Sequence, residues 1–107
     1  MIRSSAAGVT PPPEYYPRIR EICDKHDILF IADEVITGIG RTGKNFAIEH
    51  WGVVPDMITT AKALSSGYAP LAAVILHDTV YNAIAQGSGH MTQGFTYSGH
   101  PLCSAVG

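Results

Sequence analysis

The earliest strand signal in the chain is the run Ile28-Leu29-Phe30-Ile31-Ala32-Asp33-Glu34. Five consecutive apolar residues are typical of a strand that is covered on both faces, as in the sheet of an α/β protein. The run ends in two carboxylates, and open α/β sheets bind their ligands beyond the carboxyl ends of the strands. We therefore expect a buried strand over 28–32 that delivers Asp33 to a candidate site.

Other helix and strand signals alternate with this run, judged from apolar periodicity and from Gly, Pro and capping residues. They predict a helix that ends near Lys25, a short helix over 46–51, strands over Met57–Ala61 and Ala72–Leu76, a helix capped by Asp78 that runs to about Gln86, and a further helix that begins near Ala105. This order belongs to the α/β class. No linker divides the chain, so residues 1–107 are expected to belong to one domain.

The composition indicates a segment of a larger protein. Apolar residues make up 46% of the 107 residues and charged residues only 15%, whereas a small independent domain has much surface and needs more charge. We expect an internal piece of a longer polypeptide that is inactive by itself.

The sequence also argues against several classes of protein. The net charge is −2 and Lys and Arg do not cluster, so no nucleic-acid partner is expected. The apolar runs are too short to cross a bilayer, and residues 1–27 lack a signal-peptide pattern, so we expect no membrane partner and a cytoplasmic location. Cys23 and Cys103 lack metal-type spacing, which favours free thiols and no metal site.

Lys62 is the most unusual charged residue of the sequence. It follows the apolar strand Met57–Ala61 and has no neighbouring carboxylate. Such a lysine either extends to solvent or lies in an apolar pocket, where desolvation lowers its pKa and makes the amine a nucleophile. Asp33 is either a structural carboxylate or a partner that faces the same crevice. An amine and a carboxylate in one crevice are what pyridoxal 5'-phosphate requires.

A glycine-rich loop offers a competing interpretation. Gly38–Gly43 has the spacing G-x-G-x-x-G, and Gly38–Lys44 has the spacing G-x-x-x-x-G-K of a phosphate-binding loop. However, Asn45 stands where such a loop has Ser or Thr, and the first glycine does not directly follow the strand. We favour turn-making glycines, with a nucleotide-binding module as the alternative.

Three segments resemble the landmarks of class III pyridoxal-phosphate-dependent aminotransferases, and together they span most of the chain. They are Ile31-Ala32-Asp33-Glu34-Val35-Ile36-Thr37-Gly38-Ile39-Gly40-Arg41-Thr42-Gly43, the stretch from Pro55 through Lys62 to Val74, and Gly94-Phe95-Thr96-Tyr97-Ser98-Gly99-His100-Pro101. The resemblance implies part of a fold-type-I transferase large domain with a three-layer α/β/α architecture.

The resemblance also implies roles for five residues. Asp33 would pair with the pyridine nitrogen of the cofactor, and Val35 would pack on a face of its ring. Ile36 would lie near the ring hydroxyl, where several family members carry Gln; the Ile matches the omega-amino-acid:pyruvate group. Lys62 would form the Schiff base and then act as general acid and base. Thr96 would hydrogen-bond the cofactor phosphate of the neighbouring subunit, which implies a homodimer.

The activity implied is transamination from an amine or omega-amino acid to an oxo-acid such as pyruvate. A class III decarboxylase or aminomutase would share the same Asp and Lys, so these enzymes are alternatives.

Overall fold

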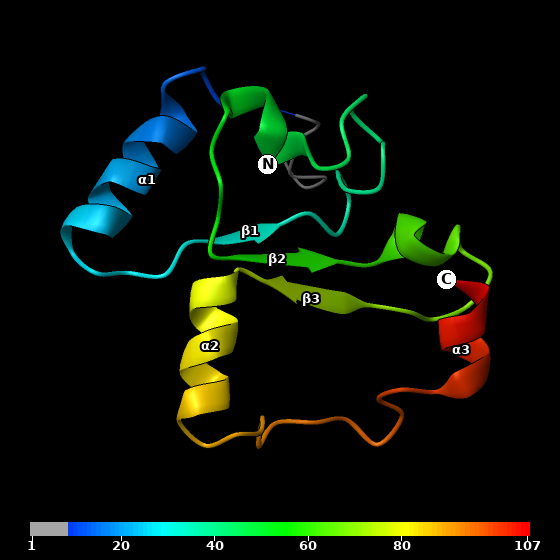
Figure 1. The fold of residues 1–107 in the computed structure, drawn as a ribbon. Coiled ribbons are helices and arrows are strands. Elements are labelled where there is room, and N and C mark those ends of the chain that lie inside the picture. The colour runs from blue at the N-terminus through cyan, green and yellow to red at the C-terminus, as the bar shows by residue number, and fades with distance from the viewer. Residues whose placement is uncertain (1–8) are drawn as a thin grey trace.

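The computed structural model describes residues 9–107 of the chain (Figure 1). Its elements are α1 (Tyr15–Lys25), β1 (Ile31–Asp33), η2 (Ala47–Trp51), β2 (Met57–Thr60), η3 (Lys62–Ser65), β3 (Ala73–Leu76), α2 (Asp78–Gln86) and α3 (Pro101–Val106), where η marks a 3₁₀ helix. The mixture of helices and strands confirms the α/β class. Within residues 9–107 no helix is both long and apolar enough to cross a membrane.

The three strands form one mixed sheet in the order β1-β2-β3. β1 runs parallel to β2 and places Asp33 opposite Thr59, whereas β3 runs antiparallel to β2. In Figure 1 the arrows of β1 and β2 point the same way, and the loop after β1 and helix η3 both leave the sheet at that edge. The carboxyl ends of the two parallel strands therefore meet at one edge.

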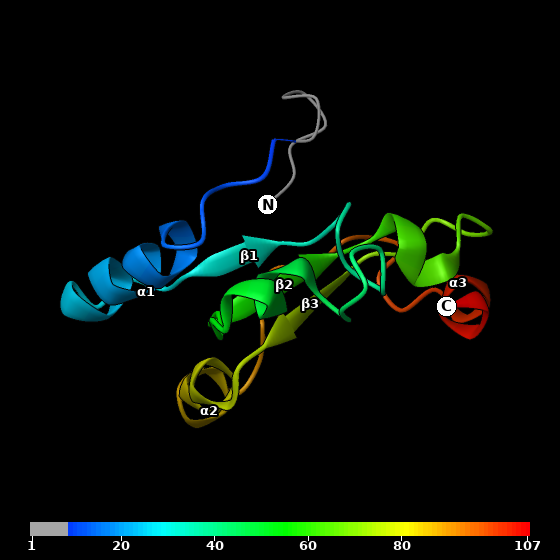
Figure 2. The ribbon, with the colours of Figure 1, turned by 90° about the horizontal axis from the view of Figure 1, so that it is seen from above.

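One face of β1 is covered by helices. The buried cluster of the described residues consists of Tyr16 and Cys23 from α1, Ile48 from η2, and Phe30, which directly precedes β1. Ala32 is buried, but its neighbour Ile31 on the other face is 50% exposed. The expectation that both faces are covered is therefore wrong for residues 9–107, because α1 and η2 lie against a single face. Seen from above in Figure 2, α1 and α2 lie at one end of the sheet and α3 at the other.

The first strand begins later than predicted. Ile28 is 52% exposed and Leu29 is 57% exposed, so these residues precede β1 rather than belong to it. The amide of Ile28 donates to the carbonyl of Cys23 at 2.9 Å, and Asp27 has a left-handed φ of 54°. Residues 26–30 are thus the exit from α1, which an apolar run alone does not distinguish from a strand.

Two helix starts also differ from the predictions. His77 is the N-cap of α2, and its side chain accepts an amide hydrogen bond, whereas Asp78 lies in the first turn. α3 begins at Pro101 rather than near Ala105, and His100 caps it in the same way. No helix was predicted over Lys62–Ser65, where the structure has η3, and the other elements lie close to their predicted bounds.

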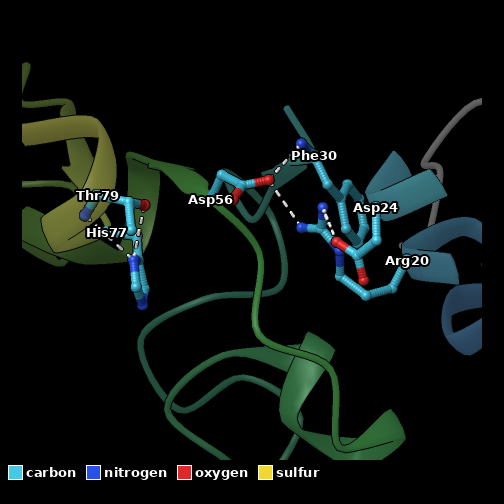
Figure 3. Close-up of polar contacts among 6 residues, drawn as sticks. All are labelled: Arg20, Asp24, Phe30, Asp56, His77 and Thr79. Atoms are coloured by element: carbon cyan, nitrogen blue, oxygen red, sulfur yellow. Dashed lines mark hydrogen bonds and ion pairs between the residues drawn. The ribbon is translucent and has the colours of Figure 1, made fainter. Parts of the chain in front are cut away.

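An ion-pair network fastens α1 to the amino ends of β1 and β2 (Figure 3). Asp56 Oδ2 accepts hydrogen bonds from Arg20 Nη1 and from the amide of Phe30, both at 2.7 Å. Arg20 Nη2 also pairs with Asp24 Oδ1 at 2.7 Å. The backbone carbonyl of Asp56 accepts the amide of His77 at 2.9 Å, which links the same point to β3 and α2.

The surroundings of Asp56 favour its charged form. Partial burial by itself would raise the pKa of Asp56, but the hydrogen bonds from Arg20 and from the Phe30 amide together with nearby positive charge outweigh it, so this pKa is lowered. The pKa of Arg20 is raised, chiefly by its hydrogen bond to Asp56. The two side chains are 20% and 21% exposed, so solvent screens the pair only in part.

Candidate functional site

The structure brings the predicted carboxylate and amine to the same edge of the sheet. Asp33 is the last residue of β1, and Lys62 opens η3 directly beyond the end of β2. The amide of Glu34 donates to the carbonyl of Thr59 at 2.8 Å, so β1 and β2 remain joined up to this point. Asp33 and Lys62 therefore lie at neighbouring strand ends, where α/β sheets bind ligands.

The Asp33 carboxylate is oriented by two donors and keeps one oxygen free. Its Oδ1 accepts the amide of Val35 at 3.1 Å and lies 3.5 Å from the hydroxyl of Thr59. Within residues 9–107 its Oδ2 takes part in no hydrogen bond, and the residue is exposed. A carboxylate held in this way can accept a hydrogen bond from a cationic ring N–H. Thr59 was not among the residues predicted from the sequence. Its place opposite Asp33 follows only from the register of β1 and β2.

Lys62 is placed by an abrupt change of backbone direction. Ala61 is extended, with φ of −162° and ψ of −151°, and Lys62 then adopts a left-handed φ of 45°. The lysine is exposed, and no ion pair in the described part of the chain includes it. The apolar pocket considered for it is therefore absent from residues 9–107, because no element of this segment covers the end of η3 that carries the lysine.

The other predicted residues divide into two groups. Val35 is half-buried and Ile36 is 40% exposed; both lie in the turn that follows Asp33, and so next to the candidate site. Thr96 is exposed in the turn before α3, and no hydrogen bond within residues 9–107 links it to Asp33 or Lys62. In Figure 1 the segment before α3 runs on the β3 side of the sheet, whereas the loop after β1 lies on the β1 side.

Sequence analysis also missed Glu34. This carboxylate is only 4% exposed and accepts hydrogen bonds from the hydroxyl of Thr37 and from the amides of Ala47 and Ile48. The alternation of strand side chains is the signal that would have found it, because it places Glu34 on the same buried face as Ala32. A carboxylate on a core face needs partners.

The glycine loop is closed by its own backbone. The amide of Gly40 donates to Asn45 at 3.2 Å, and the amide of Gly43 donates to Gly40 at 3.1 Å. Both glycines have left-handed φ values of 81° and 85°, as turn-making glycines do. A phosphate cradle needs free amides pointing at the ligand, so this geometry favours the turn interpretation over nucleotide binding.

Comparison with known proteins identifies the family. The chain matches the family described as aminotransferase class-III over residues 2–107. It belongs to the class-III aminotransferases.

Three relatives show how far the likeness extends. The putrescine--pyruvate aminotransferase of Pseudomonas aeruginosa is 49% identical over 105 residues, which are 98% of this chain and 23% of the relative. The crystal structure of a transaminase from the marine bacterium Virgibacillus is 52% identical with a TM-score of 0.88 and covers 92% of this chain and 23% of that one. An amine transaminase from an uncultivated Pseudomonas species, solved in its PLP-bound form, is 47% identical with a TM-score of 0.85 and the same coverage of 92% and 23%.

These likenesses confirm the expected fold class, because solved transaminases share the fold of this chain. The chain spans less than a quarter of the length of each of the three relatives. The described residues fit pyridoxal phosphate in two respects: Asp33 has an uncommitted carboxylate oxygen, and Lys62 has an amine without an ion-pair partner.

Proposed function

We propose that residues 1–107 are part of the cofactor-binding domain of a pyridoxal-phosphate-dependent aminotransferase, an enzyme that is complete only in a longer subunit. The subunit would move an amino group from an amine or omega-amino acid to an oxo-acid such as pyruvate. One observation carries this proposal: an oriented carboxylate with a free oxygen and an uncommitted lysine amine stand at neighbouring strand ends. Family membership supports it.

Each site residue would have a separate task. Pyridoxal phosphate, when bound, supplies an electron sink that stabilises negative charge on the substrate's alpha carbon. Asp33 would keep the pyridine nitrogen protonated by accepting its N–H. The Lys62 amine would hold the cofactor covalently and then carry a proton to and from the alpha carbon. Val35 would pack on the ring, and Ile36 would border the ring hydroxyl without a hydrogen bond.

The remaining parts of the proposal concern the whole protein. Pyruvate as acceptor is supported by a relative that is named for putrescine and pyruvate. Thr96 would contribute to the phosphate site of a second subunit in a cytoplasmic homodimer; within residues 9–107 no hydrogen bond links it to Asp33 or Lys62.

Replacement of Lys62 by Ala in the complete enzyme tests the covalent role. The variant should bind the cofactor only non-covalently and show almost no turnover, since the loss of a proton shuttle alone costs roughly 10²–10⁴ in rate. Borohydride reduction followed by peptide mass spectrometry should place the cofactor on Lys62 in the wild type. Lys44→Ala, which removes an exposed lysine from the glycine loop, is the control and should keep full activity. Attachment of the cofactor to Lys44 would refute the assignment.

Replacement of Asp33 by Asn tests the carboxylate. The cofactor should remain attached because Lys62 is intact, yet kcat should fall about a hundredfold, the scale for one preorganised electrostatic contact. Single-turnover absorbance measurements isolate the proton-transfer step from product release. Near-normal transamination by this variant would leave Asp33 with a purely structural role.

A further inference from the structure

Glu34 is a buried carboxylate to which the chemistry above assigns no task. Its Oε1 accepts the amide of Ile48 at 2.7 Å, and its Oε2 accepts the amide of Ala47 at 3.1 Å and the hydroxyl of Thr37. The residue is 4% exposed, and Thr37 is 2% exposed. A charge buried this deeply persists only with such partners, so the arrangement is a built feature of the fold.

These contacts close the glycine loop at both of its ends. Thr37 lies where the loop leaves β1, whereas Ala47 and Ile48 open η2 where the loop returns. The turn itself is tight: the amide of Gly38 donates to the carbonyl of Glu34 at 2.8 Å, and a Cβ on Gly38 would lie 2.8 Å from that same oxygen. The Glu34 side chain therefore determines where the backbone goes after Asp33.

The backbone on both sides of Glu34 acts on Asp33. On one side, the Glu34 amide donates to Thr59 and continues the β1–β2 ladder at 2.8 Å. On the other side, the Val35 amide donates to Asp33 Oδ1 at 3.1 Å and orients that carboxylate. A shift of the Glu34–Thr37 turn would move this amide, and the free oxygen of Asp33 would move with it.

We propose that Glu34 is a positioning residue, whose buried carboxylate ties Thr37, Ala47 and Ile48 together and so holds the Asp33 carboxylate toward the cofactor ring. The inference rests on the proposed function, because it gives Asp33 the role of partner to the pyridine nitrogen. Glu34 itself does not touch the cofactor; its effect passes through the Val35 amide.

A double-mutant cycle in the complete enzyme tests this inference. Glu34→Gln keeps the shape but replaces one acceptor oxygen by an NH₂ group that faces donors. By itself this change should lower kcat about tenfold. In an Asp33→Asn background the same change should lower kcat by less than about twofold, because residues that act through one another are not additive.

Two further readouts do not depend on turnover. Glu34→Gln should weaken the retention of pyridoxal phosphate during dialysis, and it should shift the pH dependence of the bound cofactor's absorption band, as expected if the ring nitrogen loses a well-placed partner. Both effects should disappear in the Asp33→Asn background. A purely structural role for Glu34 would change the thermal unfolding of the apoenzyme equally in both backgrounds and leave the band's pH dependence unchanged.

Glu49 offers a matched control because it lies on η2, the 3₁₀ helix whose first two amides donate to Glu34. Its Oε1 accepts the amide of Phe46 at 2.8 Å, but this contact is exposed and does not reach the turn after Asp33. Glu49→Gln should therefore leave kcat, cofactor retention and the absorption band as in the wild type. If Glu34→Gln does not fold, Thr37→Val removes one of the three donors to Glu34 and enters the same cycle, with a smaller loss expected in the same direction.

The outcomes separate the two proposals. Normal turnover of Asp33→Asn would refute the proposed role of Asp33 and, with it, the proposed function of this site. An impaired Asp33→Asn enzyme in which the Glu34→Gln loss is unchanged would refute only the positioning role of Glu34. A loss that largely disappears in the Asp33→Asn background supports both.

Discussion

Two adjacent carboxylates at the end of β1 have opposite environments. Asp33 is exposed at the candidate site, whereas Glu34 is 4% exposed and turned into the core. The cause is the alternation of side chains along an extended chain, which sends neighbours to opposite faces. On the proposals above, one face would receive the residue that contacts the cofactor and the other the residue that positions it.

Thr96 provides a prediction at the same scale. If its hydroxyl donates to the cofactor phosphate of a neighbouring subunit, Thr96→Ala in the complete enzyme should weaken cofactor binding by about 1–3 kcal/mol, the usual loss for a hydrogen bond to a charged group. The measurement is the dissociation constant of pyridoxal phosphate from the apoenzyme. Ser88→Ala, at another exposed position of the segment that follows α2, is the control. Unchanged affinity in Thr96→Ala would contradict a site shared between subunits.

Candidate site residues were easier to propose from the sequence than the residues that support them. Asp33 and Lys62 were proposed because Asp33 ends one apolar strand and Lys62 follows another, a local pattern that one window of sequence contains. Glu34 was missed because its partners Ala47 and Ile48 lie a loop away, and only folding brings them together. The exposure of Lys62 could not be predicted from the sequence either, because it depends on which elements cover η3.

At the scale of elements, the Arg20–Asp56 pair joins α1 to the amino ends of β1 and β2. Asp56→Asn should lower the free energy of unfolding of the complete apoenzyme by about 1.5–3 kcal/mol, because the charged hydrogen bond to Arg20 is lost. Urea denaturation measures this. Glu21→Gln breaks the Arg18–Glu21 pair, whose side chains are 73% and 64% exposed, and should change little. Equal effects of the two changes would contradict the special role of Asp56.

The same pair predicts a pH dependence with a definite sign. The pKa of Asp56 in the folded state is lower than its ordinary value of 3.8. Its contribution to stability is therefore fully present above about pH 5 and is lost as the pH falls through the folded pKa. The difference in unfolding free energy between wild type and Asp56→Asn should be constant from pH 7 to pH 5 and shrink in more acidic buffer. A difference that grows with acidity would contradict the assignment.

Element boundaries show which local rules decided the predictions. α1, β2 and β3 were predicted close to their observed ranges because their apolar periods are unambiguous. The start of β1 was wrong because the apolar residues Ile28 and Leu29 belong to the exit from α1. The starts of α2 and α3 were misjudged because His77 and His100, unusual capping residues, perform that task.

At the scale of the whole molecule, the described chain is flat and leaves much apolar surface open. The Cα radius of gyration is 15.3 Å, whereas a compact domain of this length has about 13 Å. Large apolar side chains remain exposed, among them Val54, Val74, Phe95 and Leu102 at 67%, 58%, 78% and 67%. A hollow of about 500 Å³ lined by Leu29, Val80, Ala83 and Ile84 lies open as well.

Such a surface predicts how the isolated 107-residue chain behaves. It should self-associate and bind a hydrophobic dye, because exposed apolar patches of this kind drive aggregation. Gel filtration, dye fluorescence and circular dichroism check this. A monomeric peak with cooperative thermal unfolding would contradict the proposal that these residues need the rest of a longer subunit.

The left-handed backbone at Lys62 implies an opposition between stability and activity. A side chain at φ of 45° is strained where glycine would not be. Urea denaturation should therefore give Lys62→Gly a higher free energy of unfolding than Lys62→Ala. The expected difference is about 1 kcal/mol once the greater freedom of glycine in the unfolded chain is counted. Both variants would be inactive. If Lys62 holds the cofactor as proposed, the residue that best suits the backbone at this position is one that would abolish the reaction.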